Sequence, residues 1–148
     1  MDNVRISKEN TNFALQASKM MNDKVAYWVD IADYDYDTAQ ALMESKRYLY
    51  VAFMCHQVIE KMIKAYWSKV LEEPPLKIHT LSRLAQKTGL ADQLTQKQKM
   101  FIAEMQHLNI EARYPEDRLR LSQHLNEKVC EHILEETDKL RLWIKKKL

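Results

Sequence analysis

Apolar side chains recur at intervals of three and four residues along most of the chain. This spacing gives one stripe over residues 25–42 and a second, longer stripe over residues 48–70. Because an α-helix completes a turn in 3.6 residues, each stripe lies on one face of an amphipathic helix. A further stripe begins near Leu121 and predicts a last helix of about seven turns. Residues 1–22 lack such a stripe, which favours a loosely ordered N-terminal arm or a short helix.

Two prolines and the single glycine mark boundaries after the second stripe. Pro74 and Pro75 stop that helix, because proline has no amide donor and disfavours helix in the residue before it. A short helix is then predicted over residues 81–88, with Thr80 as its cap. Gly89 follows this helix and is suited to the left-handed conformation that ends many helices.

The second half of the chain contains two further local patterns. Thr95 and Gln98 match a capping box, so another helix is expected to begin there and to run to about Leu108. Pro115 forbids a continuous helix through residues 112–124, and Tyr114 before it is pushed towards an extended conformation. We therefore predict one all-α domain over residues 23–148, an up-and-down bundle of three long helices plus two or more short ones.

Composition and charge narrow the function classes. The net charge of +2 and the pI of about 8.4 are well short of the strongly basic balance of a dedicated nucleic-acid binder. Two cysteines without a secretory leader favour a cytoplasmic protein with free thiols. The longest apolar run covers residues 48–55, so we expect no membrane partner, since a spanning helix needs about 20 apolar residues.

Charged side chains interrupt the apolar face of the second predicted helix. His56 and Glu60 are four residues apart, while Lys61 and Lys64 lie on the neighbouring face. Asp35 from the preceding helix is expected beside the same interhelical groove. Two interpretations remain open. The groove is either a polar pocket that holds a nucleotide phosphate or an internal ion network that fixes the register of the helices.

Arg113 is a further candidate for the phosphate-binding groove. It also has an alternative role at the bend, where it is expected to pair with Glu116, with Asp117 or with a neighbouring helix. The five histidines and two cysteines include neither a C-x-x-C nor an H-x-x-x-H pair. The sequence therefore predicts no metal site, and no cofactor is expected.

Three segments carry a resemblance to a known family. They contain H-Q-x-x-E-K at residues 56–61, P-P-x-x-x-H at residues 74–79 and R-Y-P at residues 113–115. In this order they resemble the HEPN family, the small helical domain found beside minimal nucleotidyltransferases. The resemblance implies a homodimeric bundle that associates with nucleotides or RNA. It also implies a minimal nucleotidyltransferase as partner, often in a toxin–antitoxin pair.

Many HEPN proteins are metal-independent ribonucleases with an arginine and a histidine separated by four to six residues. Arg118 and His124 enclose five residues, which this spacing allows. In that role the guanidinium would grip the scissile phosphate and the imidazole would take a proton from the ribose 2′-hydroxyl. On one continuous helix, however, a separation of six residues leaves the two side chains about 120° apart.

Three functions follow for this chain. The first is a non-catalytic binding module for a nucleotide, an RNA or a partner nucleotidyltransferase, and it needs only the residues that match well. The second is a ribonuclease that uses Arg118 and His124, and the third is a structural interaction bundle. Tyr27, Tyr34 and Met43 would supply apolar surface for the expected homodimer.

Overall fold

The computed structural model describes the backbone of residues 2–148 and the side chains of residues 8–114 and 116–148. This part of the chain forms α-helices and one short 3-10 helix, and it contains no strand. In chain order the helices are α1 (Asp2–Glu44), α2 (Tyr48–Val70), α3 (Leu81–Lys87), η1 (Leu90–Gln93), α4 (Gln96–Glu111), α5 (Pro115–His124) and α6 (Glu127–Lys145). The predicted all-α fold class is confirmed.

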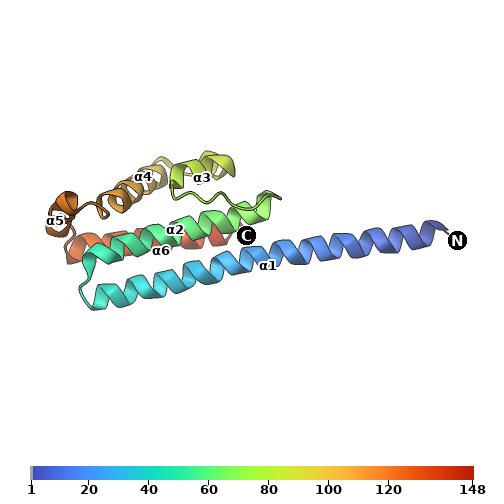
Figure 1. Ribbon diagram of the computed structural model, residues 1–148, viewed down its shortest axis with the longest axis horizontal. Helices are drawn as coiled ribbons and strands as arrows, with labels where there is room; N and C mark the ends of the chain where they lie inside the picture. Colours follow the sequence, from blue (N-terminus) through green and yellow to red (C-terminus); the bar gives the residue numbers. More distant parts are fainter. Residues whose placement is uncertain (1) are drawn as a thin grey trace.

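Helix α2 lies at the centre of the bundle. It contacts α1, α3, α4, α5 and α6. Figure 1 shows α1, α2 and α6 side by side, with α3 and α4 on the side of α2 away from α1 and α5 at one end. The segment from residue 71 to residue 80 runs back along α2 to α3, with Glu73 near Trp67 and His79 near Glu60.

The core follows the apolar stripes of the sequence. Val51, Cys55, Ile59, Met62 and Ile63 of α2 are fully buried. Small side chains at 32 and 39 in α1 are also fully buried and let α1 approach α2 closely, while residues 133, 140 and 144 close the core from α6. Each large apolar side chain removed from water contributes about 1.5–3 kcal/mol.

Most of the predicted helix boundaries match the structure. Gly89 has a φ of 76°, in the left-handed region, immediately after α3. Thr95 and Gln98 form the predicted capping box at the start of α4. Pro115 is in the first turn of α5, and Tyr114 before it is extended, with φ −107° and ψ 128°. The chain therefore bends at the R-Y-P segment, because proline begins a new helix there.

The structure differs from the sequence prediction at both ends of the chain. Residues 2–22, expected as a loosely ordered arm or a short helix, are the first half of α1 in a stretch without glycine or proline; Met1 lies outside the described residues. The long last helix expected from Leu121 is divided into α5 and α6. Asn126 causes the break, because its side chain accepts a hydrogen bond from the amide of Val129 at 3.0 Å and caps α6.

The N-terminal half of α1 extends beyond the bundle (Figure 1). Every side chain from residue 8 to residue 20 is exposed, including Phe13 and Met20. None of the helices in the described part of the chain has the length and apolarity required to span a bilayer. The predicted Thr80 cap makes no side-chain hydrogen bond to α3.

Candidate functional site

Four polar side chains meet where α2 faces the segment before α3, and we call them the Glu60 cluster: His56, Glu60, Lys64 and His79. The first three are spaced by four residues and share one side of α2. Lys64 Nζ donates to Glu60 Oε1 at 2.7 Å, and His79 Nδ1 lies 3.1 Å from Glu60 Oε2. Glu60 therefore links α2 to the P-P-x-x-x-H segment.

Burial controls the charges of this cluster. Burial alone would raise the pKa of Glu60, but the hydrogen bond and charge of Lys64, with help from His79 and Lys61, outweigh it and lower the pKa. Burial lowers the pKa of His56 to about 4, although the Glu60 carboxylate opposes this shift. His56 is fully buried, and the nearby backbone of His79 also opposes the shift. Its imidazole is therefore neutral at pH 7.

The other three residues predicted for the groove lie around the cluster. Lys61 donates to Gln57 at 2.9 Å and lies 3.9 Å from Glu60. Burial raises the pKa of Asp35, while the charge of Lys61 opposes that shift and the charge of Glu60 adds to it. Arg113 is exposed, and its charge helps to lower the pKa of His56.

Arg113 makes none of the ion pairs predicted for the bend, as far as the described side chains show. That role passes to Arg120, which donates to Glu111 at 3.0 Å and to Asp117 at 3.1 Å. Side chains in this part of α5 are thereby tied to the end of α4.

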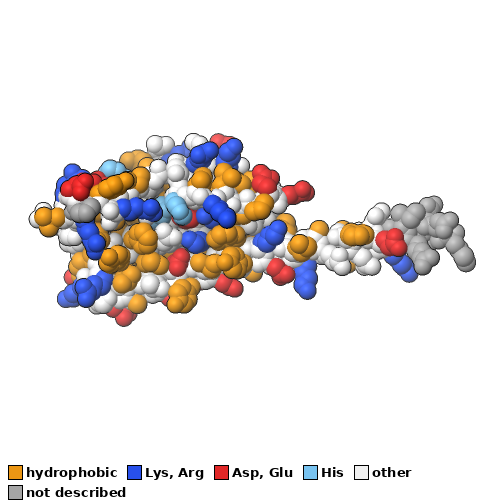
Figure 2. Space-filling model, viewed as in Figure 1, with side chains coloured by type: hydrophobic (Ala, Val, Ile, Leu, Met, Phe, Trp, Pro, Cys, Tyr) orange, Lys and Arg blue, Asp and Glu red, His pale blue; other side chains and the backbone are white. Residues whose placement is uncertain are grey.

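The Glu60 cluster resembles an internal network more than an open pocket. The charge of Lys64 is already paired with Glu60, and neither of the two described cavities is lined by a residue of the cluster. Figure 2 shows a histidine among Lys and Arg side chains on the face where the segment before α3 runs along α2. Sequence analysis did not assign His79 to this group, although the P-P-x-x-x-H motif contains it.

A second group of cations lies around a depression of about 270 Å³ beside α5 and the turn between α1 and α2. We call it the Arg118 depression. Arg118 Nη2 donates to the hydroxyl of Tyr50 at 2.8 Å, and its guanidinium lies 5.5 Å from the ring of Tyr50. The residues that line the depression include no carboxylate: Lys46, Arg47, Tyr48, Leu49, Tyr50, Arg118, Ser122 and Leu125.

Arg118 and His124 are both on α5 and are both exposed. The depression is lined by Arg118 but not by His124. Because six residues separate them on one helix, their side chains point about 120° apart. A single copy of the chain thus does not bring the predicted catalytic pair together.

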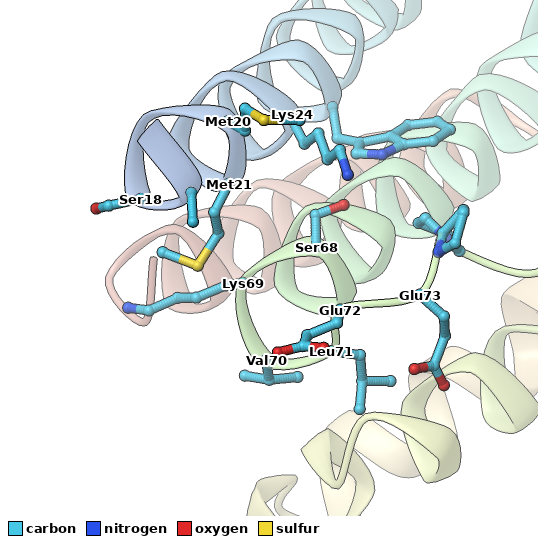
Figure 3. Close-up of a pocket in the computed structure, with 14 residues that line it drawn as sticks. Ser18, Met20, Met21, Lys24, Ser68, Lys69, Val70, Leu71, Glu72 and Glu73 are labelled. Atoms are coloured by element: carbon cyan, nitrogen blue, oxygen red, sulfur yellow. The ribbon is translucent and has the colours of Figure 1, made fainter. Parts of the chain in front are cut away.

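The larger cavity, of about 750 Å³, lies between α1 and the end of α2. Its walls are largely apolar and include Met20, Met21, Trp28 and Leu71. Figure 3 shows Met21 of α1 pointing towards the end of α2 near Lys69. Its polar lining residues include two glutamates beside two lysines, so this cavity suits a phosphate less well than the Arg118 depression, whose lining has no carboxylate.

The two cysteines are free and buried in the core. Burial raises the pKa of Cys55 to about 12 and that of Cys130 to about 11. Both thiols are therefore protonated at pH 7 and cannot act as nucleophiles. Over the described residues, no three His, Cys, Asp or Glu side chains come together in a way that could hold a metal ion.

Comparison with known proteins gives one finding. A family model described as the HEPN domain matches residues 25–148, from the second half of α1 to the end of α6. No curated protein and no solved structure matches the chain.

Proposed function

The chain belongs to the HEPN domain family, and from that premise we propose that it is a non-catalytic module that binds RNA or nucleotide phosphates. In this proposal the phosphate occupies the Arg118 depression. The supporting observation is that Lys46, Arg47 and Arg118 line one depression in which no lining residue carries a negative charge. Unpaired cations around a hollow attract a phosphate oxygen strongly.

The chemistry of Arg118 fits this role. A guanidinium has five N–H donors, and Arg118 uses one nitrogen on a neutral hydroxyl, that of Tyr50. The remaining donors are available for a phosphate, which arginine binds in bidentate fashion. The first turn of α2 adds to the positive potential, since it holds no acidic residue and helix N-termini are partly positive.

Aromatic groups at the same place favour RNA over free phosphate as ligand. Tyr48 and Tyr50 line the depression, and Tyr50 is 47% exposed. Unpaired bases stack on such rings, at about 1–3 kcal/mol per base. A single-stranded RNA segment is therefore the ligand that uses both the cations and the rings.

A ribonuclease remains the second candidate, because the Arg118–His124 spacing fits the family pattern. Cleavage requires a base within hydrogen-bond reach of the proton it removes, and His124 does not reach the depression in one copy. A homodimer that packs its α5 helices together would supply His124 from the other copy. Leu119 of α5 is 68% exposed and would be covered in such a dimer.

We further propose a minimal nucleotidyltransferase as the partner protein, in an arrangement like a toxin–antitoxin pair. This part of the proposal depends on the family alone. Expression of the chain with a nucleotidyltransferase encoded beside it, followed by purification, tests it directly. Separate elution of the two proteins would contradict it.

The RNA proposal is tested with a labelled single-stranded RNA of mixed sequence and the variant Arg118→Ala. We expect the variant to bind about tenfold more weakly and with a smaller salt dependence, because one phosphate contact is lost. Arg83→Ala is the matched control, since Arg83 is exposed on α3 and makes no ion pair with any described residue. Equal affinity of Arg118→Ala and the parent protein would refute the proposed site.

The same RNA separates binding from cleavage. Incubation with the parent protein and electrophoresis should show intact RNA if the chain only binds. Cleavage that disappears in His124→Ala would favour the ribonuclease instead. Sedimentation of the parent protein and of Leu119→Ser tests the dimer, which the serine should weaken.

A further inference from the structure

Helix α1 carries a regular row of acidic and aromatic side chains on the face opposite the core. The row comprises Asp23, Tyr27, Asp30, Tyr34 and Asp37, and we call it the α1 outer stripe. Its members are separated alternately by four and three residues, so the pattern repeats every seven residues. Tyr27 and Tyr34 are 60% and 74% exposed, and all three aspartates are exposed.

These aspartates have no counter-ion within the described chain. By contrast, Asp33, on another face of α1, pairs with Arg141 and Lys145 of α6. Those contacts lower the pKa of Asp33 although burial opposes the shift. The outer stripe thus presents three unneutralised carboxylates along one line.

The contact between α1 and α6 shows that an aspartate and a tyrosine on one helix can bind the same arginine. The guanidinium of Arg141 lies 4.6 Å from the ring of Tyr36 while its nitrogens donate to Asp33 and Asp138. Asp33 and Tyr36 are three residues apart on α1. The outer stripe contains the same two residue types at the same separation twice, in the reverse order along the helix, as Tyr27 with Asp30 and Tyr34 with Asp37. On the outer face no arginine of the described chain fills the position that Arg141 fills on the inner one.

From these observations we propose that the α1 outer stripe docks an amphipathic helix of a partner protein that bears arginines at seven-residue intervals. A seven-residue repeat on one helix matches a second helix that wraps around it at 3.5 residues per turn. The stripe covers about 21 Å of α1, enough for three turns or more of the partner. Arginine fits better than lysine, because its planar group stacks on tyrosine while it binds carboxylates.

The negative charge of the α1 outer stripe argues against two other occupants, an RNA and the same stripe of a second copy. RNA would be repelled by the three aspartates. The same stripe on a second copy would bring aspartates against aspartates in an antiparallel pair, and like charges in contact are unfavourable. A basic helix alone satisfies both the carboxylates and the rings.

The projecting half of α1 extends the same face. Met20 and Phe13 continue the seven-residue spacing from Tyr27 and are 60% and 72% exposed, and Met20 also borders the cavity between α1 and the end of α2. An isolated helix of this length is marginal in water, so a partner helix along it would stabilise it. Figure 1 shows that this half of α1 has no neighbouring helix in a single copy.

The inference concerns a protein partner and is independent of RNA binding at the Arg118 depression. Its probe is a fluorescein-labelled synthetic helix of about 21 residues, with arginine at every seventh position and leucine between the arginines on the same face. A second peptide has the same composition with the arginines distributed around the helix. We expect the patterned peptide to bind the full chain about tenfold more tightly than the redistributed one. Its affinity should fall as NaCl is raised from about 50 to about 500 mM, because salt screens the ion pairs.

Two variants locate the peptide on α1. The double variant Asp30→Asn, Asp37→Asn should bind the patterned peptide about tenfold more weakly, and Tyr34→Ala about threefold more weakly. The control Glu104→Gln, Glu131→Gln removes two exposed charges from α4 and α6 and should bind like the parent protein. All substituted side chains are exposed, so circular dichroism should show unchanged folding.

Three results would overturn the proposal. The first is equal binding of the two peptides. The second is an Asp30→Asn, Asp37→Asn variant that binds the patterned peptide as tightly as the parent protein does. The third result is a dimer of the parent protein that dissociates in Tyr34→Ala, since this would make the stripe a contact between two copies.

Discussion

Lowering the pH from about 7 to about 4.5 should destabilise the protein through His56. The imidazole is fully buried, and burial lowers its pKa from 6.5 to about 4 despite the opposing charge of Glu60, 3.9 Å away. Between these two pKa values the unfolded chain binds a proton that the folded chain does not. The free energy of unfolding is therefore highest above pH 6.5 and falls as the pH falls towards 4.

The size of the effect follows from the two pKa values. Each unit of difference corresponds to ~1.4 kcal/mol, and most of the difference is expressed by pH 4.5. We therefore expect a loss of about 2 kcal/mol between pH 7 and pH 4.5 from this one group. The lowered pKa of Glu60 adds a loss in the same direction, but only as the pH falls below 4.5, the ordinary value of that carboxyl.

Urea unfolding at constant ionic strength, followed by the fluorescence of the three tryptophans, of which Trp67 is buried, measures this loss. His56→Gln removes the titrating group while it keeps a polar side chain, so its loss over the same pH range should be smaller by about 2 kcal/mol. His124→Gln is the control, because His124 is exposed, and it should behave like the parent protein. If the parent protein and His56→Gln lose equal stability, the buried neutral imidazole is the wrong explanation.

Two further stability predictions concern single side chains. Glu60→Gln should lower the free energy of unfolding by about 3 kcal/mol in urea, because it leaves the charge of the buried Lys64 uncompensated. Adding Lys64→Met should restore most of that stability, and no recovery would argue against the pair. Gly89→Ala should lower the free energy of unfolding by about 1 kcal/mol. The loss comes from the φ of 76° alone, since the added Cβ would meet nothing within 4 Å, and an unchanged stability would contradict this origin.

Local sequence patterns predicted the fold well where a side chain is buried or where a residue begins or ends a helix. The capping box of Thr95 and Gln98, the left-handed Gly89 and the bend at Pro115 each depend on a few neighbouring residues. The first half of α1 was missed because its described side chains up to residue 20 are all exposed, so this segment has no core-facing apolar stripe. The break at Asn126 was missed because the apolar stripe continues across it while one side-chain hydrogen bond starts a new helix.

The candidate sites were predictable only as far as they lie on one helix. Spacing by four placed His56, Glu60 and Lys64 together, but Glu60 also binds His79, nineteen residues away, and this contact arises from the path of the chain before α3. Arg118 was predicted to bind a phosphate as part of a catalytic pair, but its grouping with two cations of the turn before α2 was not predicted. Lys46 and Arg47 come from the turn before α2 and meet Arg118 only through the packing of α5 on α2.

The partners of each cation decide which group can hold an anion. Lys64 is neutralised by Glu60, and Arg141 by Asp33 and Asp138, so neither leaves much potential for a phosphate. The hydrogen bond of Arg118 goes to a neutral tyrosine hydroxyl instead. A cation that is neither desolvated nor paired attracts an anion, whereas the attraction of a paired cation is already neutralised by its counter-ion within the fold. The anion site that we propose therefore lies beside α5, and we infer that the polar face of α2 holds the segment before α3 in place.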